Sequence, residues 1–556
     1  MANIGTIYER TPLLGDATAV PTNSTSSSAI LEREIDEEVG QDPSKFHSSS
    51  ATVPATTSIG RIVLVLLIGV FISNADGSLL MATHPIIASE FDALHDSNWL
   101  LTSFGLASAA TQPLYGKLSD IYGRKPLLIV AYALFAIGCA LVGVGSSMFQ
   151  LIIGRVISGL GSSGMTTLVS ILITDLVPLR EVAAWRSYVN IVATTGRSIG
   201  GPLGGWLADT VGWRWSFTGQ APLACIAIAL IAITIPSRTP TMDDVPKQNK
   251  LGRVDFLGSA FMTLAILSFL LPLEIAGDRL PWSHPVILGL FGAAFAFVFL
   301  FLIIEGRIAN EPVIPLALLR QKNMVISLCV MIGQGAAQVG LMVAVPLYFQ
   351  VTSSASNTEA GAHLIPAVVG NAVGGVLSGV VIKRTGRYKL LTLSALLFAC
   401  IGYTLLILRW HGKTSWFESL YIFPGGFGMG VIISTLFVGV QASIDPAHSA
   451  VAASSLYLAS SVGTLMGMAG TSSVLQSTLR KALNRRLDYA GFEGWKKLKI
   501  IERAVSDVHY SDHTKPRIAG IVIGSYIEAL TYTHVLSIAC SLAAFTGTVF
   551  LKEHKL

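Results

Sequence analysis

Apolar residues recur in runs of about 20 along almost the whole chain, separated by short polar stretches. An α-helical run of this length crosses the hydrocarbon core of a bilayer, so the pattern predicts an all-α polytopic membrane protein. Fourteen transmembrane helices are expected, at residues 61–83, 98–117, 126–146, 150–174, 187–208, 214–236, 255–274, 285–304, 324–350, 359–382, 389–409, 416–440, 449–475 and 523–551.

Lys and Arg are concentrated in the short loops that follow the even-numbered runs, as in "GRK" (123–125) and "KRTGRYK" (383–389). Basic loops stay on the cytosolic side, so both termini are expected in the cytosol. Residues 477–519 are also rich in Lys and Arg but fall on the opposite, luminal side. Two interpretations of this segment stay open: an amphipathic helix at the membrane interface, or a solvated luminal loop.

The polar N-terminus differs from everything that follows it. Residues 1–58 are rich in Ser, Thr, Pro and acidic residues, which predicts a disordered cytosolic tail. Within it, "YERTPLLG" has the acidic dileucine pattern (Glu9, Leu13, Leu14) that adaptor complexes read when they sort proteins to the vacuole or lysosome. The tail therefore predicts a vacuolar sorting adaptor as a partner.

Composition narrows the function classes. The chain is 52% hydrophobic and only 13% charged, and its five cysteines lie singly in apolar runs without metal-ligand spacing. No nucleophile–base pairing, metal cluster or phosphate loop is recognisable, and no basic-aromatic surface suggests nucleic acid. We therefore expect neither an enzyme nor a cofactor or metal site.

An internal repeat divides the chain into halves. "GKLSDIYGRKPLL" (116–128) follows the second run and "GVVIKRTGRYKLL" (379–391) follows the tenth. This spacing predicts two six-helix halves, at 61–236 and 324–551, with two inserted helices at 255–304. Transporters built from such repeats bind substrate near the bilayer midplane, between the halves.

These motifs resemble those of the major facilitator superfamily. "GKLSDIYGRK" resembles its loop between helices 2 and 3, which implies a conformational latch of Gly116, Asp120 and Arg124 with Asp175 as partner. "LIIGRVISGLGSSG" (151–164) resembles the helix 4 motif. "GRSIGGPLGGWLAD" (196–209) resembles the helix 5 signature of proton-coupled antiporters, carried here by Gly196, Gly201, Pro202 and Gly205.

The fourteen-helix count and the helix 5 signature resemble the larger drug:proton antiporter family. Within that family, "ADGSLLMATHPIIASEF" (75–91) and the stretch from the helix 5 signature through helix 6 are similar to fungal vacuolar basic-amino-acid transporters. The resemblance implies a proton-coupled antiporter that moves Lys, Arg and His from the cytosol into the vacuole.

Asp76 is the central candidate for substrate and proton binding, because an ionisable group at the bilayer centre costs roughly 3 kcal/mol on insertion scales and marks function. A cationic substrate and a proton would compete for its carboxylate. The alternative is that Asp76 is a structural partner of Arg155. Arg155 and Arg197 are candidates for binding the substrate carboxylate. Candidates for neutral hydrogen bonds near the midplane are Asn74, Gln334 and Gln338.

Two other functions remain open. The chain could be a multidrug:proton exporter of the plasma membrane, or a vacuolar nutrient sensor that does not transport. For the antiporter we expect a monomer in the lipid bilayer, with protons and a small cationic amino acid as ligands.

Overall fold

The computed structural model describes residues 59–556 except 94–95, 236–249, 277–279, 310 and 507, and this part of the chain folds into helices without a named strand. The helices described in the first half are α2 (Ile59–Glu90), α3 (Ser97–Tyr122), α4 (Arg124–Gly143), α5 (Met148–Leu176), α6 (Leu179–Thr210), α7 (Arg214–Thr218) and α8 (Gln220–Thr234). The connecting region contains η3 (Lys250–Arg253), α9 (Phe256–Ile275), α10 (Pro285–Arg307) and α11 (Leu316–Arg320).

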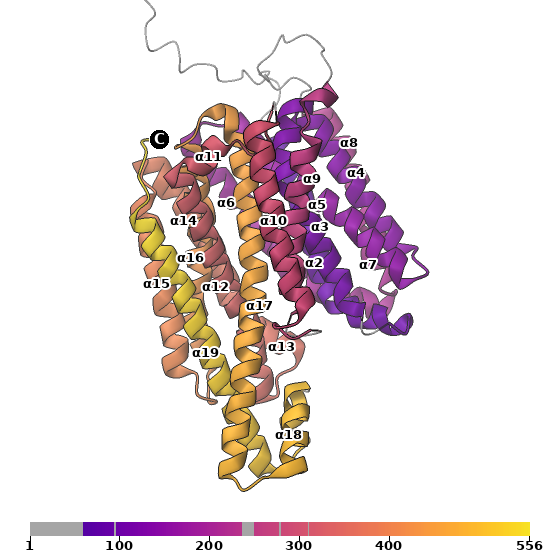
Figure 1. Cartoon of the computed structure of the whole chain (residues 1–556), viewed down its shortest axis with the longest axis vertical. Helices are drawn as coiled ribbons and strands as arrows, with labels where there is room; N and C mark the ends of the chain where they lie inside the picture. Colours follow the sequence, from indigo (N-terminus) through magenta and orange to yellow (C-terminus); the bar gives the residue numbers. More distant parts are fainter. Residues whose placement is uncertain (1–58, 94–95, 236–249, 277–279, 310, 507) are drawn as a thin grey trace, which may run out of the picture. The chain divides into compact units, whose positions relative to one another are not determined.

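The second half continues from α12 to the C-terminus (Figure 1). Its helices are α12 (Lys322–Ser353), α13 (Asn357–Ala362), α14 (Ile365–Thr385), α15 (Lys389–Arg409), η4 (Trp416–Ile422), α16 (Phe423–Gln441), η5 (Pro446–His448), α17 (Ser449–Tyr489), α18 (Gly494–Ser506), η6 (Val508–Ser511) and α19 (Pro516–Val549).

Twelve candidate spans in the described residues are long and apolar enough to cross a membrane. Two further helices, α3 with 26 residues and α6 with 32, are long enough but are not among these twelve. Both carry polar side chains that face other helices rather than lipid, such as Gln112 on α3 and Asn190 on α6. The predicted count of fourteen spans therefore stays a prediction for α3 and α6.

The same pairing of helices occurs in both halves. In the first half α2 packs on α6, α5 packs on α3 and α4, and α4 packs on α8. In the second half α12 packs on α17, α16 packs on α14 and α15, and α15 packs on α19. This repetition agrees with the sequence repeat. The largest cluster of buried apolar residues contains residues of both halves, such as Leu66 and Leu436. The halves meet where α6 packs on α14 and α3 packs on α17.

The two halves make polar contacts with each other from one end of the bundle inward. We name this end the basic end, because it carries the loops at 117–125 and 383–389. There Lys383 pairs with Glu181 at 2.9 Å, and further along the helices Ser187 donates to the Gly375 carbonyl. Near the middle of α6, Asn190 donates to the side-chain oxygen of Asn371. The halves are thus held together from the basic end to the middle of α6.

The inserted helices α9 and α10 pack on each other, and α9 also packs on α3 and α17, one helix from each half. Their loops are tied to the basic end by Glu311, which pairs with Lys117 at 3.0 Å and with Arg253 at 2.7 Å. Burial raises the pKa of Glu311, but the hydrogen bonds from Arg253 and Lys117 outweigh burial and hold that pKa below its ordinary value.

Residues 477–519 are largely helical, and both interpretations of this segment stay predictions. The span expected to end at 475 continues as α17 to Tyr489, and α18 packs on α17. Ile500, Ile501 and Ala504 of α18 are buried against Leu483 of α17 and its neighbours, and α18 lies beside the lower part of α17 in Figure 1. Trp495 and Leu498 of the same helix are 69% and 63% exposed, so part of the apolar surface of α18 is not covered by the described residues.

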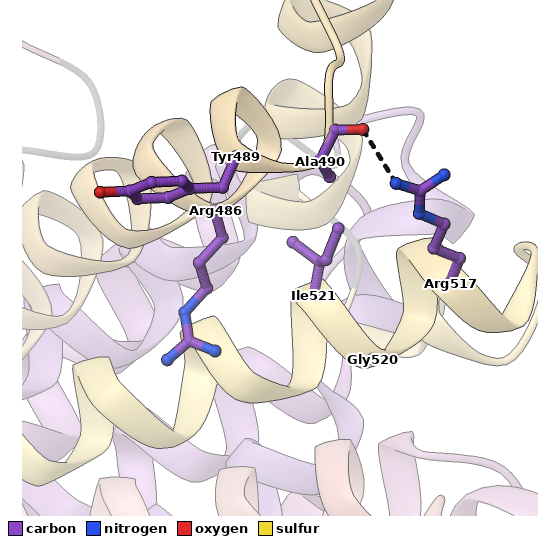
Figure 2. Close-up of a pocket in the computed structure, with 6 residues that line it drawn as sticks. All are labelled: Arg486, Tyr489, Ala490, Arg517, Gly520 and Ile521. Atoms are coloured by element: carbon purple, nitrogen blue, oxygen red, sulfur yellow. Dashed lines mark hydrogen bonds between the residues drawn. The ribbon is translucent and has the colours of Figure 1, made fainter.

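A surface pocket lies where α17 ends and α19 begins (Figure 2). Arg517 donates to the carbonyl of Ala490 at 3.1 Å, whereas Arg486 points the other way and pairs with Glu528 at 3.0 Å. The two guanidinium groups do not converge, so this pocket is not a candidate site for an anion.

Candidate functional site

Asp76 and Arg155 form an ion pair inside the first half. Asp76 lies on α2 and Arg155 on α5, and one guanidinium nitrogen (Nη1) of Arg155 is 2.7 Å from Oδ2 of Asp76. Both side chains are fully buried, with 0% of their surface exposed. Either charge alone would be strongly destabilising in this position, so each offsets the burial of the other. The sequence analysis anticipated this pairing as the alternative to a free Asp76.

Neighbouring helices complete the surroundings of the pair. Gln220, at the start of α8, donates to Oδ1 of Asp76 at 3.3 Å, and Nε of Arg155 donates to the Leu100 carbonyl at 3.2 Å. The Phe104 ring lies 4.3 Å from the guanidinium carbon. Nη2 of Arg155 has no hydrogen-bond partner among the described residues. The guanidinium therefore keeps donor capacity that a second acceptor could use.

The two glutamines predicted near the midplane lie in the second half, on α12. Gln334 is fully buried and accepts a hydrogen bond from Ser541 of α19 at 2.9 Å. Gln338 is 6% exposed, and its side-chain oxygen has no partner in the described part of the chain. The structure shows no contact between either glutamine and the Asp76–Arg155 pair, so the predicted candidates form two separate groups.

Asn74 and Arg197 stand apart from both groups. Asn74 donates to the Val70 carbonyl one turn earlier on α2, at 2.8 Å. The Arg197 side chain is exposed on α6, and its Nε donates to the Ala193 carbonyl of its own helix at 3.4 Å. The backbone carbonyl of Arg197, rather than its guanidinium, faces α2, where it accepts from Ser78. Arg197 therefore does not join Arg155.

The four residues expected to form a latch lie close together at the basic end. Arg124 donates to Asp120 at 2.6 Å and to Asp175 of α5 at 2.9 Å. A Cβ atom at Gly116 would lie 2.5 Å from the Ser454 hydroxyl and 2.9 Å from the Ala450 carbonyl, so only glycine permits this approach of α3 to α17. The ion cluster thus lies beside a close contact between the halves.

A family comparison decides what kind of protein carries this geometry. The sequence profile of the Major Facilitator Superfamily matches residues 66–468, well over half of the chain. The chain belongs to this superfamily. It is therefore a membrane transporter and not an enzyme. This confirms the predicted family, the predicted fold and the prediction that the protein is not an enzyme.

Three proteins with similar sequences show the range of functions among the relatives of this chain. The vacuolar membrane amino acid uptake transporter fnx2 of Schizosaccharomyces pombe is 29% identical over 93% of this chain and 88% of its own length. The multidrug resistance protein fnx1 of the same yeast is 30% identical over 88% and 92%. Vacuolar basic amino acid transporter 2 of Saccharomyces cerevisiae is 26% identical over 81% and 96%.

A solved structure supports the fold independently. The proton:xylose symporter XylE superposes with a TM-score of 0.55 at 17% identity, over 89% of this chain and 96% of its own. At this identity the similarity concerns the major facilitator fold alone.

Within this major facilitator fold, the helix 5 signature packs differently from the expectation. Gly196 approaches the Phe71 carbonyl, but the other glycines in close contact with α2 are Gly200 and Gly204, where a Cβ atom would lie 2.5 Å from the Ala75 carbonyl and 2.8 Å from the Leu79 carbonyl. A Cβ atom at Gly205 would meet nothing within 4 Å. The close contact with α2 therefore runs along the face of α6 that carries Gly196, Gly200 and Gly204, and Gly201 and Gly205 lie on a neighbouring face. The role of the signature in proton-coupled antiport stays a prediction.

Pro202 lies inside α6 on an exposed side of the helix. The sorting signal (Glu9, Leu13, Leu14) lies outside the described residues.

Sequence reasoning missed two polar side chains. The sequence analysis did not single out Gln220, which lies inside the apolar run expected at 214–236. A glutamine inside such a run indicates a buried hydrogen-bond donor. The fifth apolar run is expected at 187–208, which leaves Arg186 in the loop before it. The helix begins at Leu179, directly after Pro178, which places Arg186 two turns inside α6, where it is 5% exposed. The Pro178–Glu181 start signal could have revealed this.

Proposed function

We propose that this transporter is a proton-coupled antiporter that moves the basic amino acids Lys, Arg and His from the cytosol into the vacuole. The observation that carries the proposal is the fully buried Asp76–Arg155 pair. Two of the reported relatives are named for amino-acid transport at the vacuolar membrane, and this supports the substrate class and the compartment.

Asp76 provides one carboxylate for which three cations compete: a proton, the cationic substrate and the Arg155 guanidinium. In the acidic lumen, protonation of Asp76 neutralises it and releases the substrate. In the neutral cytosol Asp76 loses the proton and binds substrate again, displacing Arg155. Nη2 of Arg155 is then available for the substrate carboxylate. Competition for a single carboxylate is the simplest route to exchange.

The latch residues Asp120, Arg124 and Asp175, with Gly116, stabilise the closed basic end in this proposal. Opening toward the cytosol separates α3 from α17 and α6 from α14, and alternating access follows from rocking of one half against the other. The dileucine of the tail would direct the protein to the vacuole through a sorting adaptor.

Labelled lysine uptake into acidified vacuolar vesicles tests the proposal. Vesicles with the wild-type protein, without it, and with Asp76→Asn are compared, with the exposed Asp209→Asn on α6 as the matched control. We expect uptake that needs the protein and the pH gradient, survives in Asp209→Asn and is lost in Asp76→Asn. Lysine uptake that persists in Asp76→Asn would contradict the role of Asp76.

The multidrug function remains the second candidate, because the relative fnx1 is named a multidrug resistance protein. The same cells are therefore loaded with a cationic dye. If the dye is extruded through this protein at the plasma membrane and lysine does not move, the multidrug function replaces the amino-acid function.

A further inference from the structure

Arg186 of α6 lies between the two halves, near the basic end. Its guanidinium carbon is 3.6 Å from the centre of the Phe437 ring on α16 and 5.6 Å from that of Tyr457 on α17. Its Nη1 is 3.4 Å from the Tyr457 hydroxyl, which also bonds Ser170 of α5. A first-half cation is thus enclosed by aromatic side chains of the second half.

Arg186 differs from the other buried arginines because it has no carboxylate partner in the described part of the chain. Arg155 pairs with Asp76, and Arg124 pairs with Asp120 and Asp175, whereas no ion pair involves Arg186. Its Nε is buried without an acceptor. A cation–π contact offsets only part of the cost of burying a guanidinium, so an anionic group would be bound favourably at this position.

We propose that Arg186 binds the carboxylate of the amino-acid substrate as it enters through the opened basic end, before that carboxylate reaches Arg155, an inference that rests on the proposed amino-acid function. Phe437 and Tyr457 belong to the second half, so opening the basic end withdraws them from Arg186 and leaves its planar donors free. A guanidinium binds a carboxylate through two parallel hydrogen bonds. On closure the rings return to the guanidinium and displace the carboxylate.

The face of α6 that carries Arg186 supports this role. Asn190 follows one turn later on the same face and bonds Asn371 across the same contact between the halves. Both side chains are buried at contacts with the second half, Arg186 against Phe437 and Tyr457 and Asn190 against Asn371. When the basic end opens, they would line the path of a substrate that enters from that end.

Lysine and cadaverine, the same diamine without the carboxylate, separate this proposal from a purely structural role. The KM for labelled lysine and the inhibition constant of cadaverine are measured in vesicles for the wild type, Arg186→Gln and Arg186→Lys. Arg180→Gln, an exposed arginine on the same helix, is the control. In Arg186→Gln we expect the lysine KM to rise at least about tenfold, with the cadaverine constant changed less than about twofold. Arg186→Lys should recover part of the lysine affinity.

Phe437→Leu distinguishes the carboxylate site from a clamp between the halves. It removes the ring beneath Arg186 but leaves the guanidinium, so the preference for lysine over cadaverine should persist. The proposal fails, and Arg186 is a clamp, if Arg186→Gln raises the lysine KM and the cadaverine inhibition constant by the same factor. It also fails if Phe437→Leu abolishes the preference for lysine as Arg186→Gln does.

A variant without measurable uptake is tested as purified protein. Lysine should raise the melting temperature of the wild type but not of Arg186→Gln, and equal protection of both overturns the proposal. If the wild type itself moves no lysine, the amino-acid function fails, and this outcome is separate from the comparison of variants.

Discussion

The two halves of this transporter share their backbone packing but differ in what they bury. In the first half α6 approaches α2 through Gly200 and Gly204, and in the second half α17 approaches α12 through Gly463 and Gly467, where a Cβ atom would lie 2.6 Å from Ile332 or Ala336. One helix of each contact also carries a buried polar group that bonds a third helix. In the first half Asp76 of α2 pairs with Arg155 of α5, and in the second half Gln334 of α12 accepts a neutral hydrogen bond from Ser541 of α19.

No Asp, Glu, Lys or Arg is fully buried in the described part of the second half, whose buried titratable groups include His363 and His534. Close helix packing therefore does not require buried charge. Close packing alone therefore does not account for the buried charges of the first half, and this is the physical reason why the proposed proton coupling is assigned to them.

Breaking the Asp76–Arg155 ion pair is the test of the difference between the halves from which we expect the largest effect. Arg155→Gln leaves the Asp76 carboxylate buried without its partner, so we expect a loss of about 3–5 kcal/mol in the free energy of unfolding, together with loss of transport. Thermal unfolding of the purified protein measures this stability. The double variant Asp76→Asn/Arg155→Gln should regain most of the stability but no transport. If it also regains transport, the pair is structural.

Overpacking the shared helix contact tests the common feature of the halves. Gly200→Ala and Gly467→Ala place a Cβ atom against backbone, so each should destabilise by about 1–3 kcal/mol. Gly205→Ala is the matched control, because a Cβ atom there meets nothing within 4 Å. Equal melting temperatures for Gly200→Ala and Gly205→Ala would contradict the packing described for α2 and α6.

Replacing Gln334 tests whether the buried neutral hydrogen bond of the second half matters less for transport than the buried ion pair of the first half. Gln334→Leu removes the acceptor of the Ser541 hydroxyl and should cost about 1 kcal/mol. Lysine uptake should keep its dependence on the pH gradient, since no buried charge changes. Loss of that dependence would move coupling into the second half.

The ion pairs of Glu311 should have the smallest effect, because the Glu311 side chain is 33% exposed. Glu311→Gln should lower the melting temperature slightly at neutral pH. Because its pKa is held below the ordinary value of 4.5, the stabilisation is present above that pH and is lost as the pH falls through the lowered pKa. Wild type and variant should therefore converge in acid, and a gap that persists there would contradict this assignment.

The sequence by itself determined the features that depend on length, periodicity and charge along the chain. Apolar runs define the spans because unpaired backbone groups are excluded from lipid, and the paired motifs at 116–128 and 379–391 define the two halves. Asp76 and Arg155 were identified as buried ions because charge inside an apolar run requires a partner.

Only the tertiary structure decided which side chains meet. The partner of Asp76, the separation of Gln334 and Gln338 from it and the exposure of Arg197 depend on helix rotation, which an apolar run does not specify. Arg186 shows this most clearly. The sequence pattern places it in a loop, whereas in the structure its guanidinium is enclosed by Phe437 and Tyr457, about 250 residues or more away along the chain. Contacts between halves are set by packing across an interface, and no local pattern in either half encodes them.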